Sequence, residues 1–133
     1  MGGNWNRTVT ESPTVFLVDD DPSVRRSLQR LIKSAGFAVE TFAGAREFLA
    51  AFQPRAKTCL LLDVQMPDMN GLELQEELNH RGADIPIIVM SGYANARMKA
   101  DARSAGALAF LAKPFEEEEL LDHIREAMHM DAP

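Results

Sequence analysis

The sequence has a single cysteine, no long apolar run and no excess of basic residues. Cys59 is the only cysteine among 133 residues, which excludes an internal disulfide framework and a cysteine metal cluster and predicts a small buried hydrophobe at that position. No apolar run approaches the roughly 18 residues of a membrane span, and residues 1–13 contain no apolar signal region. These absences predict a soluble, cytoplasmic chain that does not bind a membrane.

Basic residues are outnumbered, 14 to 20, and the formal net charge is −6. Nucleic-acid binding by this chain is not expected, because contacts with phosphates need a basic surface. The length suits one domain, and 46% apolar with 26% charged residues is ordinary for a globular protein. We predict a flexible extension over 1–13, one domain over 14–129, and a tail or the start of a linker over 130–133.

Five short apolar runs alternate with segments that can form helices. The runs cover 15–18, 38–42, 59–62, 85–90 and 107–111. Mostly continuous apolar runs suit strands that are buried on both faces, as in parallel sheets, whereas the more polar second run suits an edge. The alternation predicts an α/β fold, with a parallel sheet covered by helices on both faces.

Capping residues and apolar spacing predict individual helices. Asp21, followed by proline, predicts an N-cap, and Asn70 with Glu73 three residues later resembles a capping box. Between residues 95 and 106, Met98 is the only large apolar residue. We therefore expect this fourth helix to be weakly anchored and easier to shift than the others.

Polar side chains follow four of the five runs, at the edge where open parallel sheets bind ligands. They are Asp19, Asp20 and Asp21 after the first run, Asp63 after the third, Ser91 after the fourth and Lys113 after the fifth. Crowded carboxylates repel one another unless a cation compensates, and Mg²⁺ accepts a few carboxylates together with waters. A metal ion and a lysine beside one carboxylate favour phosphoryl transfer to that carboxylate.

Four motifs at these strand ends resemble the receiver domain of bacterial two-component response regulators. They are Val-Asp-Asp-Asp at 18–21, Leu-Asp-Val-Gln-Met-Pro-Asp-Met-Asn-Gly at 62–71, Met-Ser-Gly-Tyr at 90–93 and Ala-Lys-Pro-Phe at 112–115. The resemblance covers about residues 14–128 and implies a flavodoxin-like, doubly wound sheet of five parallel strands in the order 2-1-3-4-5, with five helices. The residues of these motifs are similar to those in receivers of the FixJ and NarL groups, which usually precede a helix-turn-helix DNA-binding domain.

The resemblance implies a phosphoacceptor and a metal site. Asp63 would accept a phosphoryl group from a sensor histidine kinase or phosphotransfer protein. Asp20 and Asp63 would bind Mg²⁺, for which Mn²⁺ could substitute, and Asp19 would act through water or by orienting a ligand. The backbone carbonyl of Gln65 would complete the protein's share of the ligands.

The resemblance also implies a switch. Ser91 would hydrogen-bond the phosphoryl group, Lys113 would pair with it, and Phe110 stands where the family keeps an aromatic switch residue, although it could equally be a core residue. The surface of the fourth helix, last strand and last helix would then change its partner, with a homodimer as one outcome. The chain would catalyse only its own phosphorylation and dephosphorylation and would not otherwise be an enzyme.

Small departures from the family pattern leave every catalytic group in place. Ser91 replaces the commoner threonine and keeps its hydroxyl, whereas Phe110 lacks the hydroxyl of the commoner tyrosine. Gln65 and Tyr93 occupy variable positions that in the family tune autodephosphorylation, and their bulk favours a longer-lived phosphoryl state.

Rival interpretations fit less well. A haloacid-dehalogenase-type phosphatase needs a second aspartate where Gln65 stands, and a flavodoxin-like electron carrier would not place three aspartates at its phosphate loop. An EF-hand over 63–71 lacks two ligands. Two alternatives remain open: a stand-alone receiver, and an interaction module that works without phosphorylation. If a DNA-binding domain follows in the full protein, the output is transcription.

Overall fold

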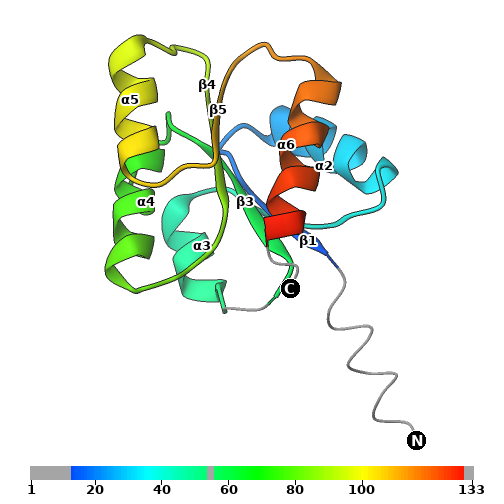
Figure 1. Ribbon diagram of the computed structural model, residues 1–133, viewed down its shortest axis with the longest axis horizontal. Coiled ribbons are helices and arrows are strands. Elements are labelled where there is room, and N and C mark those ends of the chain that lie inside the picture. The colour runs from blue at the N-terminus through cyan, green and yellow to red at the C-terminus, as the bar shows by residue number, and fades with distance from the viewer. Residues whose placement is uncertain (1–12, 54–55, 131–133) are drawn as a thin grey trace, which may run out of the picture.

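The computed structural model describes residues 13–53 and 56–130 as one α/β layer structure (Figure 1). Five parallel strands form a single sheet in the order β2-β1-β3-β4-β5, which confirms the predicted fold class and strand order. The strands are β1 (Thr14–Val18), β2 (Ala38–Phe42), β3 (Thr58–Asp63), β4 (Ile87–Ser91) and β5 (Ala109–Ala112). The helices of the described residues are α2 (Pro22–Ser34), α3 (Ala45–Ala51), α4 (Gly71–His80), α5 (Ala96–Ser104) and α6 (Glu117–Met130).

The helices cover both faces of the sheet, so the core has two layers. On one face, β-strand residues such as Phe16 and Leu62 pack against α3, α4 and α5. On the other face, residues such as Leu17 and the fully buried Cys59 pack against α2 and α6. Figure 1 shows α3, α4 and α5 on one side of the sheet and α2 and α6 on the other. Successive strand residues point to opposite faces, and both faces are apolar because both are covered.

The predicted strands and caps are largely confirmed. Strand β2 lies at the edge and is half exposed. The apolar run at 85–90 begins two residues before its strand, because Ile85 packs into the core from a loop position. The Asp21 side chain accepts hydrogen bonds from the backbone N–H groups of the first turn of α2, and Asn70 and Glu73 form the predicted capping box of α4.

Helix α5 has little apolar contact with the rest of the domain, as the sequence predicts. Ala102 is the buried residue of this helix, and Met98 is only partly buried. Two side-chain amides of α4 compensate: Gln75 donates to the carbonyl of Ala102 over 2.9 Å, and Asn79 donates to that of Ala105 over 2.9 Å. These polar contacts at the C-terminal end of α5 were not predicted from the sequence.

Gly71 allows α4 to begin directly against the end of β3. A Cβ atom at this position would lie 2.7 Å from the Asp63 carbonyl oxygen and 2.9 Å from the Val64 Cα atom, closer than side chains tolerate. The Gly71 N–H also donates to the Val64 carbonyl over 3.0 Å. The loop between β3 and α4 is thereby held beside the carboxyl edge of the sheet.

Parts of the predicted domain boundaries fall outside the described residues. The extension predicted over 1–13 is described only at Pro13, and of the tail predicted over 130–133 only Met130 is described, as the last residue of α6. Within the part of the chain that the structure describes, no helix is long and apolar enough to span a bilayer.

Candidate functional site

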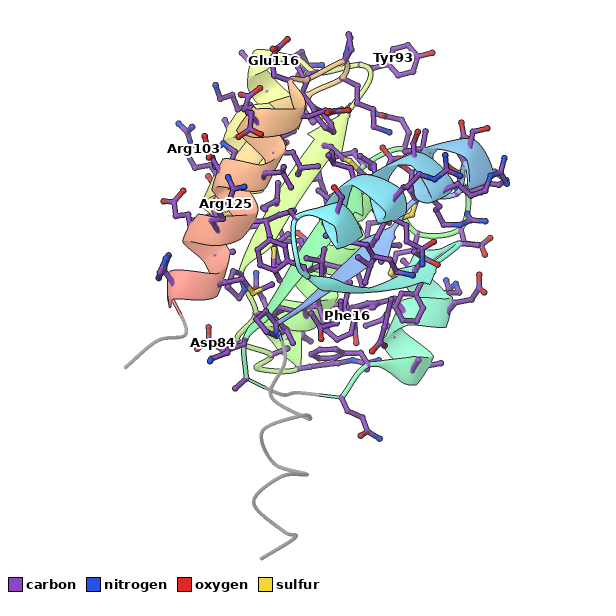
Figure 2. The ribbon with its side chains drawn as sticks, turned by 90° about the vertical axis from the view of Figure 1, so that its right-hand side faces the viewer. Phe16, Asp84, Tyr93, Arg103, Glu116 and Arg125 are labelled. Atoms are coloured by element: carbon purple, nitrogen blue, oxygen red, sulfur yellow. The ribbon has the colours of Figure 1, made fainter. Side chains whose placement is uncertain are left out.

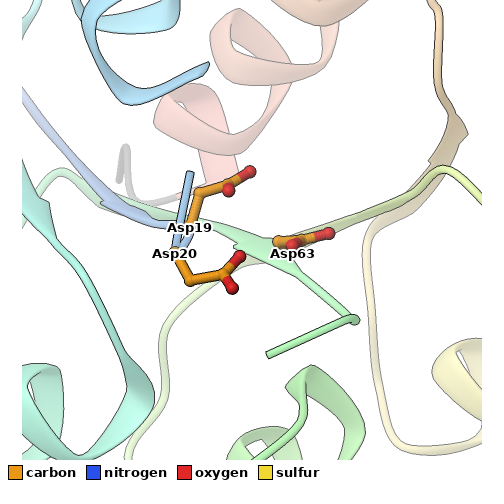
Figure 3. Close-up of side chains that lie close together, drawn as sticks. All are labelled: Asp19, Asp20 and Asp63. Carbon is orange, nitrogen blue, oxygen red and sulfur yellow. The ribbon is translucent and has the colours of Figure 1, made fainter. Parts of the chain in front are cut away.

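Three carboxylates meet at the carboxyl edge of the sheet. Strands β1 and β3 are neighbours, with Val18 opposite Leu62. Asp19, which follows Val18, and Asp63, which follows Leu62, therefore lie side by side (Figure 3). One oxygen each from Asp19, Asp20 and Asp63 lies within 4.8 Å of the others. Asp19 and Asp63 are buried, whereas Asp20 is exposed.

Lys113 brings a positive charge to these carboxylates from the end of β5. Its Nζ atom lies 3.1 Å from Asp19 Oδ2 and 3.4 Å from Asp63 Oδ1. Burial by itself would lower the pKa of Lys113, but the hydrogen bond and charge of Asp19, together with Asp63, outweigh burial and raise this pKa above its ordinary value. The lysine is therefore charged at neutral pH and is held between two acids.

The Asp63 carboxylate lies in surroundings that disfavour its negative charge. Burial, followed by repulsion from Asp19, raises the pKa of Asp63 from 3.8 to about 6, and Lys113 opposes this rise only in part. The negative charge of Asp63 is thus incompletely compensated by the protein, so an added cation would be stabilised there.

The oxygen atoms of the three acids fit a hard divalent cation. Asp19 Oδ1 accepts a hydrogen bond from the Asp21 N–H over 2.9 Å, and Asp19 Oδ2 is the atom nearest Lys113. Both oxygens of Asp19 therefore have partners within the protein. Carboxylates with waters are ligands that Mg²⁺ prefers, so the three acids together could hold such an ion.

A cavity of about 300 Å³ lies over these groups. Its walls include Asp19, Asp20, Asp63, Gln65, Tyr93 and Lys113. The cavity is large enough for a phosphoryl group and an ion, and five of the predicted site residues line it. Tyr93 is 78% exposed, and its side chain projects outward (Figure 2).

Ser91 is buried, and its hydroxyl has two partners. The Ser91 Oγ–H donates to Gln65 Oε1 over 2.8 Å, and Ser91 Oγ accepts from the Tyr93 backbone N–H over 3.0 Å. The sequence predicted Ser91 at this edge but gave no signal for its contact with the Gln65 side chain.

Phe110 lies apart from the acidic cavity. It is partly buried against the core layer that includes α5, and it lines a separate cavity of about 190 Å³ with residues from the start of α5, among them Asn95 and Lys99. It therefore contacts the weakly packed helix rather than the carboxylates.

Sequence reasoning missed one neighbour of the site. The Arg25 guanidinium on α2 donates to the backbone carbonyl of Asp19 over 2.7 Å, which ties α2 to the acidic loop. Nothing in the local sequence distinguishes Arg25 from the other arginines of this helix. The interpretation of Asp21 as a helix cap is confirmed by its bonds to the N–H groups of Ser23 and Val24.

The fold and the site together define a class: a flavodoxin-like α/β domain with an acidic pocket and a lysine at the carboxyl edge of its sheet. The sequence model of the response regulator receiver domain matches residues 15–125. The chain belongs to this receiver domain family. Receiver domains of response regulators are regulatory modules of two-component systems that interact with histidine kinases or phosphotransfer proteins.

Individual proteins show the same relationship. The response regulator protein TodT of Pseudomonas putida is 44% identical over 116 residues, which are 87% of this chain and 51% of TodT. The transcriptional regulatory protein FixJ of Azorhizobium caulinodans is 40% identical over 122 residues, 92% of this chain and 58% of FixJ. A solved structure of the response regulator StyR has a TM-score of 0.85 at 48% identity, covering 91% of this chain and 61% of that one. The chain spans about half the length of the curated relatives it matches.

Proposed function

We propose that this chain is a phosphorylation-dependent switch with Asp63 as its phosphoacceptor. The observation that carries the proposal is the placement of Asp63, buried beside Asp19 with the Lys113 ammonium 3.4 Å away. In the reaction, an Asp63 oxygen forms a bond to the phosphorus of a phosphohistidine on the kinase or phosphotransfer protein. The phosphorus–nitrogen bond breaks, and the histidine leaves with the electron pair.

Mg²⁺ is the proposed cofactor, with Mn²⁺ as a substitute. Asp20 and Asp63 would hold it directly, Asp19 would act through water, and the Gln65 backbone carbonyl would complete the protein's share. When bound, the ion supplies positive charge against the phosphoryl oxygens. Lys113 supplies the charge on the other side and holds Asp63 in place for attack.

Phosphorylation replaces the single negative charge of the Asp63 carboxylate with a phosphoryl group that carries about −1.5 to −2 charges and three acceptor oxygens. The proposed response is that the Ser91 hydroxyl and the Lys113 ammonium turn towards the phosphoryl oxygens. Tyr93, whose N–H is bonded to Ser91 Oγ, and the start of α5 would follow, with Phe110 adjusting against that helix. Coupling free energies of roughly 1–3 kcal/mol would shift the equilibrium between the two states about five- to 150-fold.

The surface formed by α5, β5 and α6 is the proposed output surface. A second phosphorylated copy is a proposed partner, and transcription is the proposed output of the full protein, by analogy with relatives that are transcriptional regulators. Gln65 lines the cavity beside Asp63, which supports the proposal that its side chain hinders the attacking water and lengthens the life of the phosphoryl state.

Intact-mass measurement tests the phosphoacceptor. The wild-type protein and the Asp63→Asn variant are incubated with a small phosphodonor, with and without Mg²⁺. We expect a Mg²⁺-dependent gain of one phosphoryl group in the wild type and none in the variant. Asp68→Asn, an exposed change in the same loop, should be phosphorylated like the wild type.

Two outcomes would overturn the proposal. Wild-type protein that gains no mass under any condition would favour an interaction module that works without phosphorylation. A gain that persists in Asp63→Asn would place the acceptor on another residue.

A further inference from the structure

In the absence of a phosphoryl group, the Ser91 hydroxyl already donates one hydrogen bond and accepts another. It donates its single proton to Gln65 Oε1 over 2.8 Å and accepts from the Tyr93 N–H over 3.0 Å. Ser91 is completely buried, and both partners of its hydroxyl are groups of the protein. The resting state therefore has a defined hydroxyl orientation, set by a side chain from another loop.

The backbones on both sides of this contact are fixed independently of it. The Val64 N–H donates to the Met90 carbonyl over 3.0 Å, and the Lys113 N–H donates to the Ser91 carbonyl over 2.8 Å. Strands β3, β4 and β5 thus hold Gln65 and Ser91 close together whatever the Ser91 hydroxyl does. The hydrogen bond between the two side chains can break by side-chain rotation without moving a strand.

We propose that Gln65 is a positioning residue that restrains Ser91 in the unphosphorylated state and thereby opposes activation. This inference rests on the proposed function, in which the Ser91 hydroxyl donates to a phosphoryl oxygen on Asp63. One hydroxyl proton serves one of these acceptors at a time. Phosphorylation therefore has to break the hydrogen bond between Ser91 and Gln65. The free energy of this bond stabilises the unphosphorylated state and opposes the change to the active state.

The restraint extends to the loop before α5. Ser91 Oγ accepts the Tyr93 N–H, and Tyr93 lies three residues before the first residue of α5. While Gln65 holds the Ser91 side chain, this acceptor stays in place for Tyr93. Rotation of Ser91 towards the phosphoryl group removes the acceptor and releases the segment that leads into the weakly packed helix.

The test uses the whole chain and beryllium fluoride with Mg²⁺, which mimics a phosphoryl group on an aspartate. Gln65→Met has a similar size but no hydrogen-bond acceptor of comparable strength. A typical hydrogen bond in a protein corresponds to a change of about fivefold in an equilibrium constant. We expect Gln65→Met to bind beryllium fluoride about fivefold more tightly than the wild type.

A double-mutant cycle shows whether the effect passes through Ser91. In the Ser91→Ala background no hydroxyl proton remains to be shared, so adding Gln65→Met should change the affinity by less than about twofold. The amide resonance of Tyr93 gives a second measurement. In Gln65→Met without beryllium fluoride, it should move towards its position in the beryllium-fluoride-bound wild type.

The outcomes separate this inference from the proposed function. If the wild type binds neither beryllium fluoride nor a phosphoryl group, the proposed function itself is wrong. The wild type can instead bind beryllium fluoride and a phosphoryl group while Gln65→Met leaves the affinity for beryllium fluoride unchanged, or raises it equally in the Ser91→Ala background. In either case Gln65 does not restrain Ser91.

Discussion

At the scale of single residues, Asp63 is held where its negative charge is costly. Burial and the neighbouring Asp19 raise its pKa from 3.8 to about 6. In the absence of a divalent cation, the folded protein thus binds a proton on Asp63 more tightly than the unfolded chain does. The contribution of Asp63 to the free energy of unfolding therefore falls as the pH rises from 3.8 towards 6. Above pH 6 the charged carboxylate destabilises the folded protein to its full extent.

Asp63→Asn should therefore stabilise the metal-free protein at neutral pH. Asparagine keeps the shape of the side chain without its charge, so we expect the free energy of unfolding to rise by about 1–3 kcal/mol at pH 7. Near pH 4 most of this gain should disappear, because the wild-type carboxyl is then protonated in the folded state. Urea unfolding at both pH values measures the difference.

The exposed Asp68 provides the control for this prediction. Asp68→Asn should change the free energy of unfolding by less than about 0.5 kcal/mol at either pH. A destabilised Asp63→Asn protein at pH 7 would show that Lys113 compensates the Asp63 charge fully.

At the scale of elements, the contact between β3 and α4 positions the loop that carries Gln65. Gly71 makes this contact possible, because its missing side chain leaves room for the Asp63 carbonyl and the Val64 Cα atom. Both obstacles are backbone atoms, one in the last residue of β3 and one in the residue after it, so they cannot move aside alone. Any side chain at position 71 has to displace α4 or the end of β3.

Gly71→Ala is expected to lower the free energy of unfolding by about 1–3 kcal/mol, as other overpacking changes do. It should also slow phosphorylation of Asp63, because the strand end shifts with the carboxylate. Gly92→Ala is the matched control: a Cβ atom there would meet nothing within 4 Å. Chemical denaturation compares the two variants, and equal stabilities would contradict the steric argument.

Helix α5 is held differently from its neighbours. Its apolar contact depends on Ala102 and the partly buried Met98, while Gln75 and Asn79 of α4 bond its C-terminal carbonyls. Directional bonds fix the end of the helix, and little apolar area holds its start near Asn95. The end that adjoins the Ser91 loop is therefore the end that is easier to displace.

At the scale of the whole molecule, the outer surfaces of α5 and α6 carry opposite charges. On α5 the exposed Arg97, Lys99 and Arg103 outnumber the exposed Asp101, and exposed acidic residues lie near the start of α6. The two helices flank β5, the strand at the end of the sheet. A second copy related by a two-fold axis would place basic residues of one chain against acidic residues of the other.

Phosphorylation is expected to convert monomers into dimers that weaken with salt. In light scattering with a small phosphodonor and Mg²⁺, the wild type should double its mass, whereas Asp63→Asn should keep the mass of a monomer. The fraction of wild-type dimer should fall at high ionic strength. Arg103→Glu reverses a charge on α5 and should weaken the dimer roughly tenfold. If Asp63→Asn formed dimers, dimerisation would not depend on phosphorylation of Asp63. If phosphorylated Arg103→Glu dimerised as strongly as the wild type, the charge on α5 would not contribute to the dimer.

The sequence by itself determined the sheet and the convergence of the acidic residues. Continuous apolar runs separated by helical segments can bury both faces only as parallel strands covered by helices, so the strand ends and the groups that follow them had to meet at one edge. Asp19, Asp63 and Lys113 were predicted together for this reason, without any distance being known.

Only the tertiary structure decided how those groups are paired. The Ser91–Gln65 bond, the packing of Gly71 against β3 and the anchoring of α5 by Gln75 join residues that are distant in sequence or depend on one side-chain rotamer. Periodicity and capping signals are local, whereas these contacts depend on distances of a few ångströms across elements. The pKa of Asp63 belongs with them, because burial and the separation of charges exist only in the folded protein.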